Sequence, residues 1–183
     1  MANSASSPLF TFILSSLTSI LLLSTTAAAA ARNNDLINRV CRNTTNAAFC
    51  SDVIYSDPHA ADADQYFLAY IAFRAAYFNA TDTSQYIASK LKSMAADRKS
   101  GILLGLRKCQ GYYRDAIRTL AEMLGDLDSE TFSGLDTLSL EVEGDARACR
   151  AAVGGQSVLS RRNENLMKLA NICLVISKLY PYH

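Results

Sequence analysis

The chain has 183 residues, half of them hydrophobic, and its 18 basic and 17 acidic side chains nearly cancel. This balance gives no support for nucleic acid or an anionic membrane surface as the main partner. With 8 glycines, 3 prolines and no tryptophan, the composition argues against a disordered chain and against a turn-rich all-β fold.

An uncharged leader opens the chain. Residues 1–31 contain no charged side chain, and their apolar stretch from Leu9 to Leu23 gives way to alanines. Small residues after an apolar segment are typical of a signal peptide, and we expect cleavage after Ala30 or Ala31. Serines and threonines interrupt the stretch, which favours a cleaved signal over an anchor of about 20 apolar residues. The mature domain, residues 32–183, is therefore expected to be secreted and free of the membrane.

Two cysteines mark the start of the mature chain. Cys41 and Cys50 are separated by eight residues and precede Asp57-Pro58. In the oxidising compartment that a signal peptide implies, cysteines in a helical chain favour disulfides over a metal site. We therefore expect a short helical hairpin over residues 32–57, closed by a Cys41–Cys50 disulfide.

The next two stretches have the hydrophobic spacing of amphipathic helices. One lies between Asp62 and Ala96 and has its apolar side at Ala69, Phe73, Ala76, Ala80, Ile87, Leu91 and Met94. The other follows Ser100-Gly101, ends at Gly125-Asp126 and has its apolar side at Ile102, Leu106, Cys109, Tyr113, Ala116, Leu120 and Met123.

Two further helices end at glycine and at proline, which commonly stop helices. The first has its apolar side at Ser139, Val142, Ala146, Cys149 and Val153 and is closed by Gly154-Gly155; the second has it at Leu166, Leu169, Cys173, Ile176 and Tyr180 and is stopped by Pro181. Amphipathic helices joined by short connections bury their apolar faces most simply as an antiparallel bundle. The sequence thus predicts an all-α fold in which an antiparallel four-helix bundle, residues 62–180, follows the hairpin.

The remaining cysteines fit this bundle. Cys109 and Cys149 fall on the inward sides of consecutive helices, so they can meet in a second disulfide. Cys173 is left over, and it is either a reactive or intermolecular thiol or a small buried hydrophobic residue. We favour the buried thiol, because free cysteine is among the most buried residue types.

No catalytic pattern is found. The two histidines, His59 and His183, are not near a serine or cysteine in any nucleophile pattern, and alone they cannot build a zinc site. The carboxylates Asp126, Asp128 and Glu130 fit a solvated connection between helices better than a pair of acid–base catalysts. We therefore expect a protein without enzymatic activity, metal or cofactor.

Two groups of residues are candidates for a binding surface. Arg107, Arg114 and Arg118 recur at helical spacing on the face opposite the apolar side of their helix, where the alternative is an ordinary solvated face. The stretch from Tyr66 to Phe78 holds six aromatic residues, more than one buried face needs, so one or two should form an exposed patch.

Two sequons for N-linked glycosylation are present, at Asn43-Thr44-Thr45 and at Asn79-Ala80-Thr81. Secretion would expose both asparagines, Asn43 and Asn79, to glycosylation.

The cysteine framework and the residues around it follow a known pattern. They are Cys41 with Thr44 and Cys50, Asp57-Pro58, Leu68-Ala69, Cys109 with Tyr113 and Ala116, Cys149, Arg162-Asn163 and the closing helix from Leu169 to Leu179. This arrangement resembles the plant invertase and pectin methylesterase inhibitor family, over essentially the whole mature chain.

The resemblance implies a secreted protein inhibitor that docks its bundle onto a plant invertase or pectin methylesterase and blocks substrate entry, in the cell wall (apoplast) or else in the vacuole. Invertase-inhibiting members often carry Pro-Lys-Phe ahead of the last framework cysteine, where this chain has Glu130-Thr131-Phe132. Phe132, in a polar connection away from the apolar sides, joins the three arginines as a candidate contact. The alternative is a secreted helical module that binds a lipid or another apolar ligand without inhibiting an enzyme, in a pocket lined by the surplus aromatics.

Overall fold

Helices make up most of the chain that the computed structural model describes, which is residues 35–94, 101–154 and 159–180. The expected signal peptide and Pro181 lie outside these residues. The elements in order are a helical segment at residues 35–42, α2 (Ala47–Tyr55), the 3-10 turn η1 (Ala60–Asp62), α3 (Gln65–Ser93), α4 (Gly101–Asp128), α5 (Leu135–Val153) and α6 (Ser160–Ser177). The all-α prediction is confirmed.

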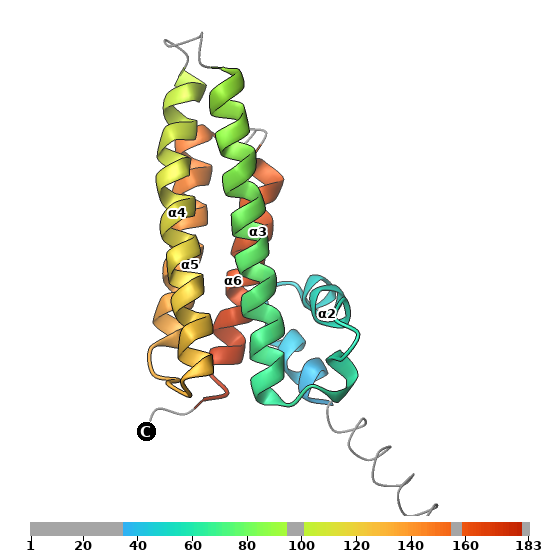
Figure 1. Ribbon diagram of the computed structural model, residues 1–183. Helices are drawn as coiled ribbons and strands as arrows, with labels where there is room; N and C mark the ends of the chain where they lie inside the picture. Colours follow the sequence, from blue (N-terminus) through green and yellow to red (C-terminus); the bar gives the residue numbers. More distant parts are fainter. Residues whose placement is uncertain (1–34, 95–100, 155–158, 181–183) are drawn as a thin grey trace, which may run out of the picture.

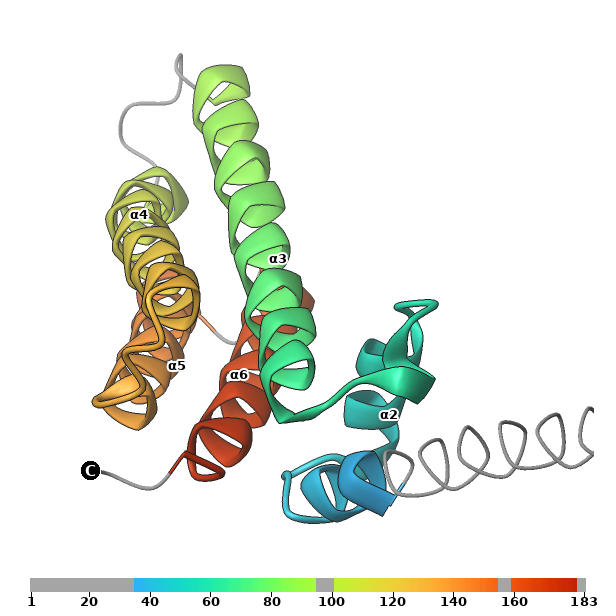
Figure 2. The ribbon, with the colours of Figure 1, turned by 60° about the horizontal axis from the view of Figure 1, so that its bottom comes forward.

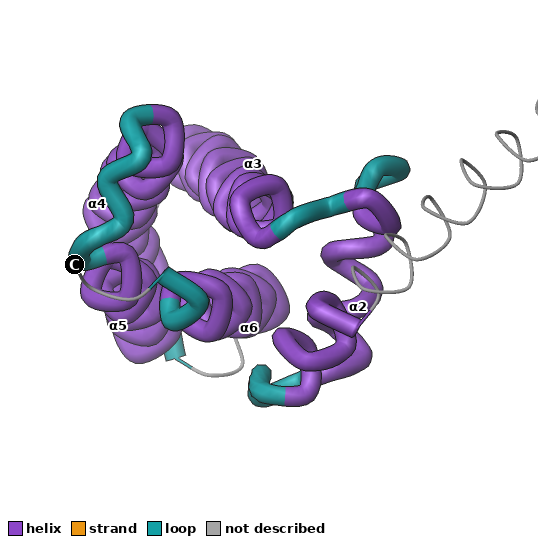
Figure 3. Tube along the Cα trace, turned by 90° about the horizontal axis from the view of Figure 1, so that it is seen from below, coloured by secondary structure: helices purple, strands orange, loops and turns teal. Residues whose placement is uncertain are grey.

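The four long helices, α3 to α6, form an up-and-down bundle (Figure 1). Each helix packs against the next along the chain, and α6 closes the ring by packing against α3. Seen along the bundle axis, the helices surround one core, and the N-terminal hairpin lies outside it, beside α3 and α6 (Figures 2 and 3). The hairpin therefore covers one side of the bundle and leaves the outer faces of α4 and α5 uncovered.

Side-chain caps fix where two helices begin. The Asn46 side chain accepts a hydrogen bond from the Phe49 N–H at the start of α2, at 3.0 Å, and the Asp64 side chain accepts one from the Phe67 N–H at the start of α3, at 2.8 Å. Such caps satisfy backbone donors that have no partner within the helix. Because Asp64 provides this cap, α3 begins at Gln65 rather than near Asp62, which lies in η1.

The predicted apolar side of α4 is buried from Leu106 to Met123 and is wrong only at its first position, Ile102. Ile102 is 56% exposed, and Leu103 is buried in its place. The helices α3 and α4 have 29 and 28 residues against 19 and 18 for α5 and α6, so the first turn of α4 extends past the end of α5 (Figure 1). Gly125 does not end the helix, because Leu127 continues the buried face and α4 runs to Asp128.

A buried polar contact ties three helices together. The Tyr113 hydroxyl of α4 donates a hydrogen bond to Oδ1 of Asn163 on α6, at 2.9 Å, and both residues are almost fully buried. Burial raises the pKa of Tyr113 far above its usual value, while a hydrogen bond to Thr83 of α3 and the charge of Arg162 oppose the shift. The Tyr113–Asn163 hydrogen bond favours one arrangement of the helices, because misaligned partners would lose it, although the Asn163 Nδ2 atom is buried without a partner.

The structure contains both expected disulfides, Cys41–Cys50 and Cys109–Cys149, and Cys173 is a buried free thiol. The second bridge closes a loop of 40 residues between α4 and α5, which the chain-entropy model values at about 4 kcal/mol. One turn before Cys109, Gly105 meets the backbone of α5: a Cβ there would lie 2.5 Å from the Ala152 carbonyl oxygen.

Gly105→Ala should destabilise the protein because the added methyl collides with backbone that cannot move aside. We expect a loss of about 1–3 kcal/mol, typical of overpacking. Gly111→Ala on the same helix is the matched control, since nothing lies within 4 Å of its added Cβ and alanine favours a helix by up to about 1 kcal/mol. Chemical unfolding should show a lower free energy of unfolding than wild type for Gly105→Ala and a higher one for Gly111→Ala. Equal stability changes would contradict the close approach of α4 to α5.

Candidate partner-binding surface

Three arginines, the arginine ridge, run along the outer face of α4. Arg107, Arg114 and Arg118 are all exposed, with 78% and 74% of the side chains of Arg114 and Arg118 accessible. The ridge is about 16 Å long at the rise of an α-helix. The outward position expected for these residues is therefore where the structure places them.

Asp115 lies among these arginines and partly neutralises them. Its Oδ1 is 3.8 Å from Nε of Arg114 and 3.2 Å from a terminal guanidinium nitrogen of Arg118. The arginine ridge therefore carries a negative charge among its positive ones. The i,i+3 spacing of Asp115 and Arg118 is the sequence signal that would have revealed this pair.

Asp145 of α5 extends the charged surface from α4 to α5, because it interacts with Asp115 and Arg118. Burial raises the pKa of its carboxyl to about 6; the nearby carboxylates of Asp115 and Glu141 act in the same direction, and Arg118 acts against it. This acidic group (Asp115, Glu141 and Asp145) could not be predicted from the sequence, because it depends on how two helices align. The outer face of α4 and α5 thus carries a line of arginines beside a group of carboxylates, and the pKa of one of these, Asp145, is raised to about 6.

Phe132 is anchored rather than free. It lies in the connection between α4 and α5, is half-buried, and stacks on Tyr180, with ring centroids 4.4 Å apart. The Tyr180 hydroxyl donates to the Gln65 carbonyl oxygen at 3.0 Å, and burial raises its pKa to about 12. The Phe132 ring thus packs against the residues that follow α6, and it is only partly available to a partner.

The expected aromatic patch lies on the outer side of α3. Tyr66 is 37% and Phe78 is 56% exposed, and the Arg74 guanidinium carbon lies 5.7 Å and 5.3 Å from the ring centroids of Tyr70 and Phe78. A surface groove of about 340 Å³ runs between this face and the end of the hairpin; its lining is Val53, Ser56, Asp57, Pro58, Ile71, Arg74, Ala75 and Phe78. Phe73 instead fills the core. This surface groove is the site that the aromatic stretch offers to the apolar-ligand alternative.

The two sequons occupy different surroundings. Asn43 is exposed in the turn that joins the two hairpin helices, whereas Asn79 is half-buried in the middle of α3.

Within the described residues, no three histidine, cysteine or carboxylate side chains are grouped as a metal site would require. A separate search of the same part of the chain found no helix with the length and hydropathy needed to cross a membrane.

Replacing Asp145 tests the charge arrangement on this face. A folded-state pKa near 6, against 3.8 for an unperturbed aspartate, means that folding favours the protonated form. Protonated Asp145 therefore stabilises the fold at a pH below 3.8, the pKa of an unperturbed aspartate. This stabilisation is lost as the pH rises through about 6, where the carboxyl of the folded protein ionises. Asp145→Asn should therefore raise the melting temperature relative to wild type at pH 7.5 and lose that advantage towards pH 4. A difference that does not vary with pH would contradict this account.

Comparisons with known proteins agree with the fold and the cysteine framework. The family model described as plant invertase/pectin methylesterase inhibitor matches residues 35–176. The crystal structure of mutant form A of a pectin methylesterase inhibitor from Arabidopsis is similar, with a TM-score of 0.67 and 25% identity, covering 79% of this chain and 96% of that chain.

A second crystal structure, of a pectin methylesterase inhibitor from Arabidopsis thaliana, shares the fold, with a TM-score of 0.61 and 23% identity over 81% of this chain and 98% of that chain. No curated protein sequence matches the chain. Proteins of the matching family are inhibitors without enzymatic activity of their own. Because the family model spans well over half of the sequence, the chain belongs to the plant invertase/pectin methylesterase inhibitor family.

Proposed function

We propose that this protein is a secreted inhibitor of a plant pectin methylesterase, which it blocks by docking its helical bundle over the substrate cleft. The observation that carries the proposal is the family match over residues 35–176, together with the likeness to a solved pectin methylesterase inhibitor. The uncharged leader and the two disulfides support secretion into the cell wall.

Inhibition by docking needs a rigid surface rather than reactive groups. The outer face of α4 and α5 meets this need, since the Cys109–Cys149 bridge joins the two helices and the hairpin packs on the other side of the bundle. A cleft that binds sugars is usually lined by polar and acidic groups. The arginine ridge supplies the complementary charge, which mainly accelerates association and sets its salt dependence.

A plant invertase is the second candidate target, because the matching family model covers inhibitors of both enzymes. The sequence Glu130-Thr131-Phe132 keeps only the aromatic residue of the Pro-Lys-Phe found in many invertase inhibitors. In addition, Phe132 stacks on Tyr180 and so has only part of its ring available to a partner. Both features favour pectin methylesterase.

Activity assays with the purified secreted protein test this function directly. Plant pectin methylesterase should lose activity in proportion to the inhibitor added, to a limit set by a stoichiometric complex, while plant invertase should retain most of its activity. Protein that is heated and reduced serves as the control, because it lacks the folded bundle. Inhibition of invertase alone would transfer the proposal to the second target, and inhibition of neither enzyme would refute it.

Reversing charge on the arginine ridge tests which face docks. Arg114→Glu combined with Arg118→Glu should lower the association rate at low salt by about tenfold or more, with a smaller effect at high salt, since salt screens such steering. Lys92→Glu combined with Arg161→Glu is the matched control, because it changes net charge equally at exposed positions on α3 and α6. Surface plasmon resonance against the inhibited enzyme measures both. Equal losses in the two double variants would show that net charge, rather than this face, matters.

A further inference from the structure

The structure separates the two sequons, and from this we propose that the protein carries one N-linked glycan, on Asn43, whose first sugar occupies the cleft between the hairpin and α6. The proposal depends on passage through the secretory pathway but not on which enzyme is inhibited. The second sequon, at Asn79, stays unmodified.

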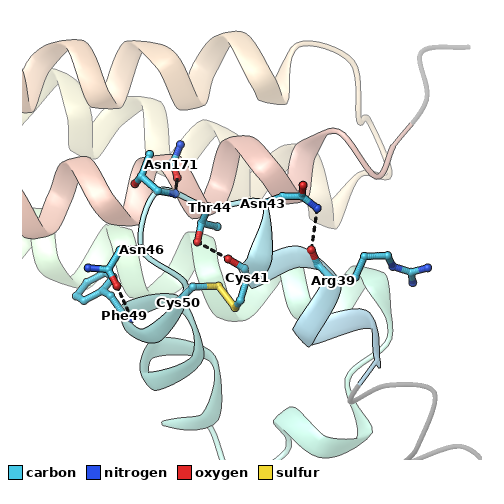
Figure 4. The surroundings of a disulfide bond; sticks show 9 residues. Arg39, Cys41, Asn43, Thr44, Asn46, Phe49, Cys50 and Asn171 are labelled. Atoms are coloured by element: carbon cyan, nitrogen blue, oxygen red, sulfur yellow. Dashed lines mark hydrogen bonds between the residues drawn. A yellow bond between two sulfur atoms is a disulfide. The ribbon is translucent and has the colours of Figure 1, made fainter.

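The first sequon is presented as a transferase would need it. Asn43 and Thr45 are exposed in the turn after the first hairpin helix, close to the Cys41–Cys50 bridge (Figure 4). The Thr44 hydroxyl donates to the Cys41 carbonyl oxygen at 2.7 Å, and the Thr45 N–H donates to Oδ1 of Asn171 on α6 at 2.8 Å. These bonds hold the turn without using the Thr45 hydroxyl, the group that completes a sequon.

The second sequon is enclosed. Asn79 and Thr81 lie within the 29-residue helix α3, and the Asn79 Oδ1 and Thr81 Oγ1 atoms are both buried without a hydrogen-bond partner. Residues i and i+2 of a helix do not face each other, so the amide and the hydroxyl of this sequon cannot meet one binding site together. A chain folded in this way presents the second sequon less well than the first, because both its residues are half-buried within a helix.

A cleft next to Asn43 can receive the first sugar. It measures about 290 Å³ and is lined by Arg39, Val40 and Asn43 of the hairpin and by Val175, Lys178 and Leu179 at the end of α6. This volume is at the lower end of the roughly 300–1,000 Å³ of small-molecule sites and suits a single sugar ring. The valine and leucine side chains can cover the apolar face of the ring, while Arg39 and Lys178 can donate hydrogen bonds to its hydroxyls.

The chemistry leaves the existing contacts of Asn43 intact. Its Nδ2 donates one N–H to the Arg39 carbonyl oxygen at 2.8 Å (Figure 4), which leaves the second N–H free. A lipid diphosphate-linked oligosaccharide is the co-reactant. A bond forms between Nδ2 and the anomeric carbon of the first sugar, the bond from that carbon to the phosphate oxygen breaks, the lipid diphosphate leaves with the electron pair, and Nδ2 loses one proton. The remaining N–H can still bind the Arg39 oxygen.

Matched threonine variants of the full chain, expressed in a eukaryotic secretory host, test where the glycan is attached. Thr45→Val and Thr81→Val each remove one sequon hydroxyl with little change of shape, and Thr45→Ser restores the first sequon. Intact-mass measurement should find one glycan on wild type, Thr81→Val and Thr45→Ser, and none on Thr45→Val. Three results would overturn the proposal. They are a wild-type chain without a glycan, wherever in the cell it is recovered, a glycan on Thr45→Val, and loss of the glycan in Thr81→Val.

Enzymatic trimming tests where the first sugar lies. Wild-type protein trimmed to a single sugar should melt several degrees above Thr45→Val from the same host, because the sugar bridges the hairpin and α6. As a control, wild type and Thr45→Val are made in bacteria, without glycan and with disulfides formed. Their melting temperatures should be equal, which would show that the substitution itself does not change stability. Equal melting of the trimmed protein and Thr45→Val would show that the sugar projects into solvent and would overturn its placement in the cleft.

Discussion

The rest of the structure depends on the close, cross-linked approach of α4 to α5. The Cys109–Cys149 bridge joins the two helices, and one turn away Gly105 lets α4 lie against the Ala152 carbonyl. Because these contacts fix how the two helices align, they also fix which side chains share their outer face. The juxtaposition of Arg118 and Asp115 on α4 with Asp145 on α5 follows from that alignment. The close approach of α4 to α5 thus both holds these two helices together and determines which charges lie side by side on their outer face.

Polar contacts elsewhere hold the other helices to this pair. Asn163 of α6 accepts a hydrogen bond from the Tyr113 hydroxyl in the core. The neighbouring residue Arg162 forms an ion pair with Asp82 of α3, and its guanidinium carbon lies 4.4 Å from the ring centroid of Tyr86. At the opposite end, the Gln65 side chain donates to the Leu179 carbonyl oxygen at 2.8 Å. These bonds join α3 to both ends of α6 without using the outer face of α4 and α5. The described side chains that hold the other helices to α4 and α5 therefore leave this face out of their contacts.

Much of the fold could be predicted from the sequence, because it follows from local periodicity. The centre of each apolar side, from Leu106 to Met123 in α4 for example, is buried as the spacing indicates. Ile102 was misplaced because its surroundings depend on the unequal lengths of the helices. The charged surface was only half predicted: spacing placed the arginines outward, but no pattern within one helix shows that Asp145 comes near Asp115. Phe132 lies in the connection between helices, as predicted, but its stacking on Tyr180 could not be predicted, because Tyr180 is 48 residues away in the sequence.

Docking of the outer face of α4 and α5 onto a plant pectin methylesterase is the step on which the proposed function depends. Hydrogen–deuterium exchange of the inhibitor, alone and with an excess of the enzyme, tests it most directly, because it locates the contact without any substitution. The account predicts slower exchange along α4 around Arg114 and Arg118 and along the facing turns of α5, with the hairpin unchanged. Protection confined to the hairpin and the aromatic side of α3, around Arg74 and Phe78, would contradict it and would assign docking to the opposite side of the bundle.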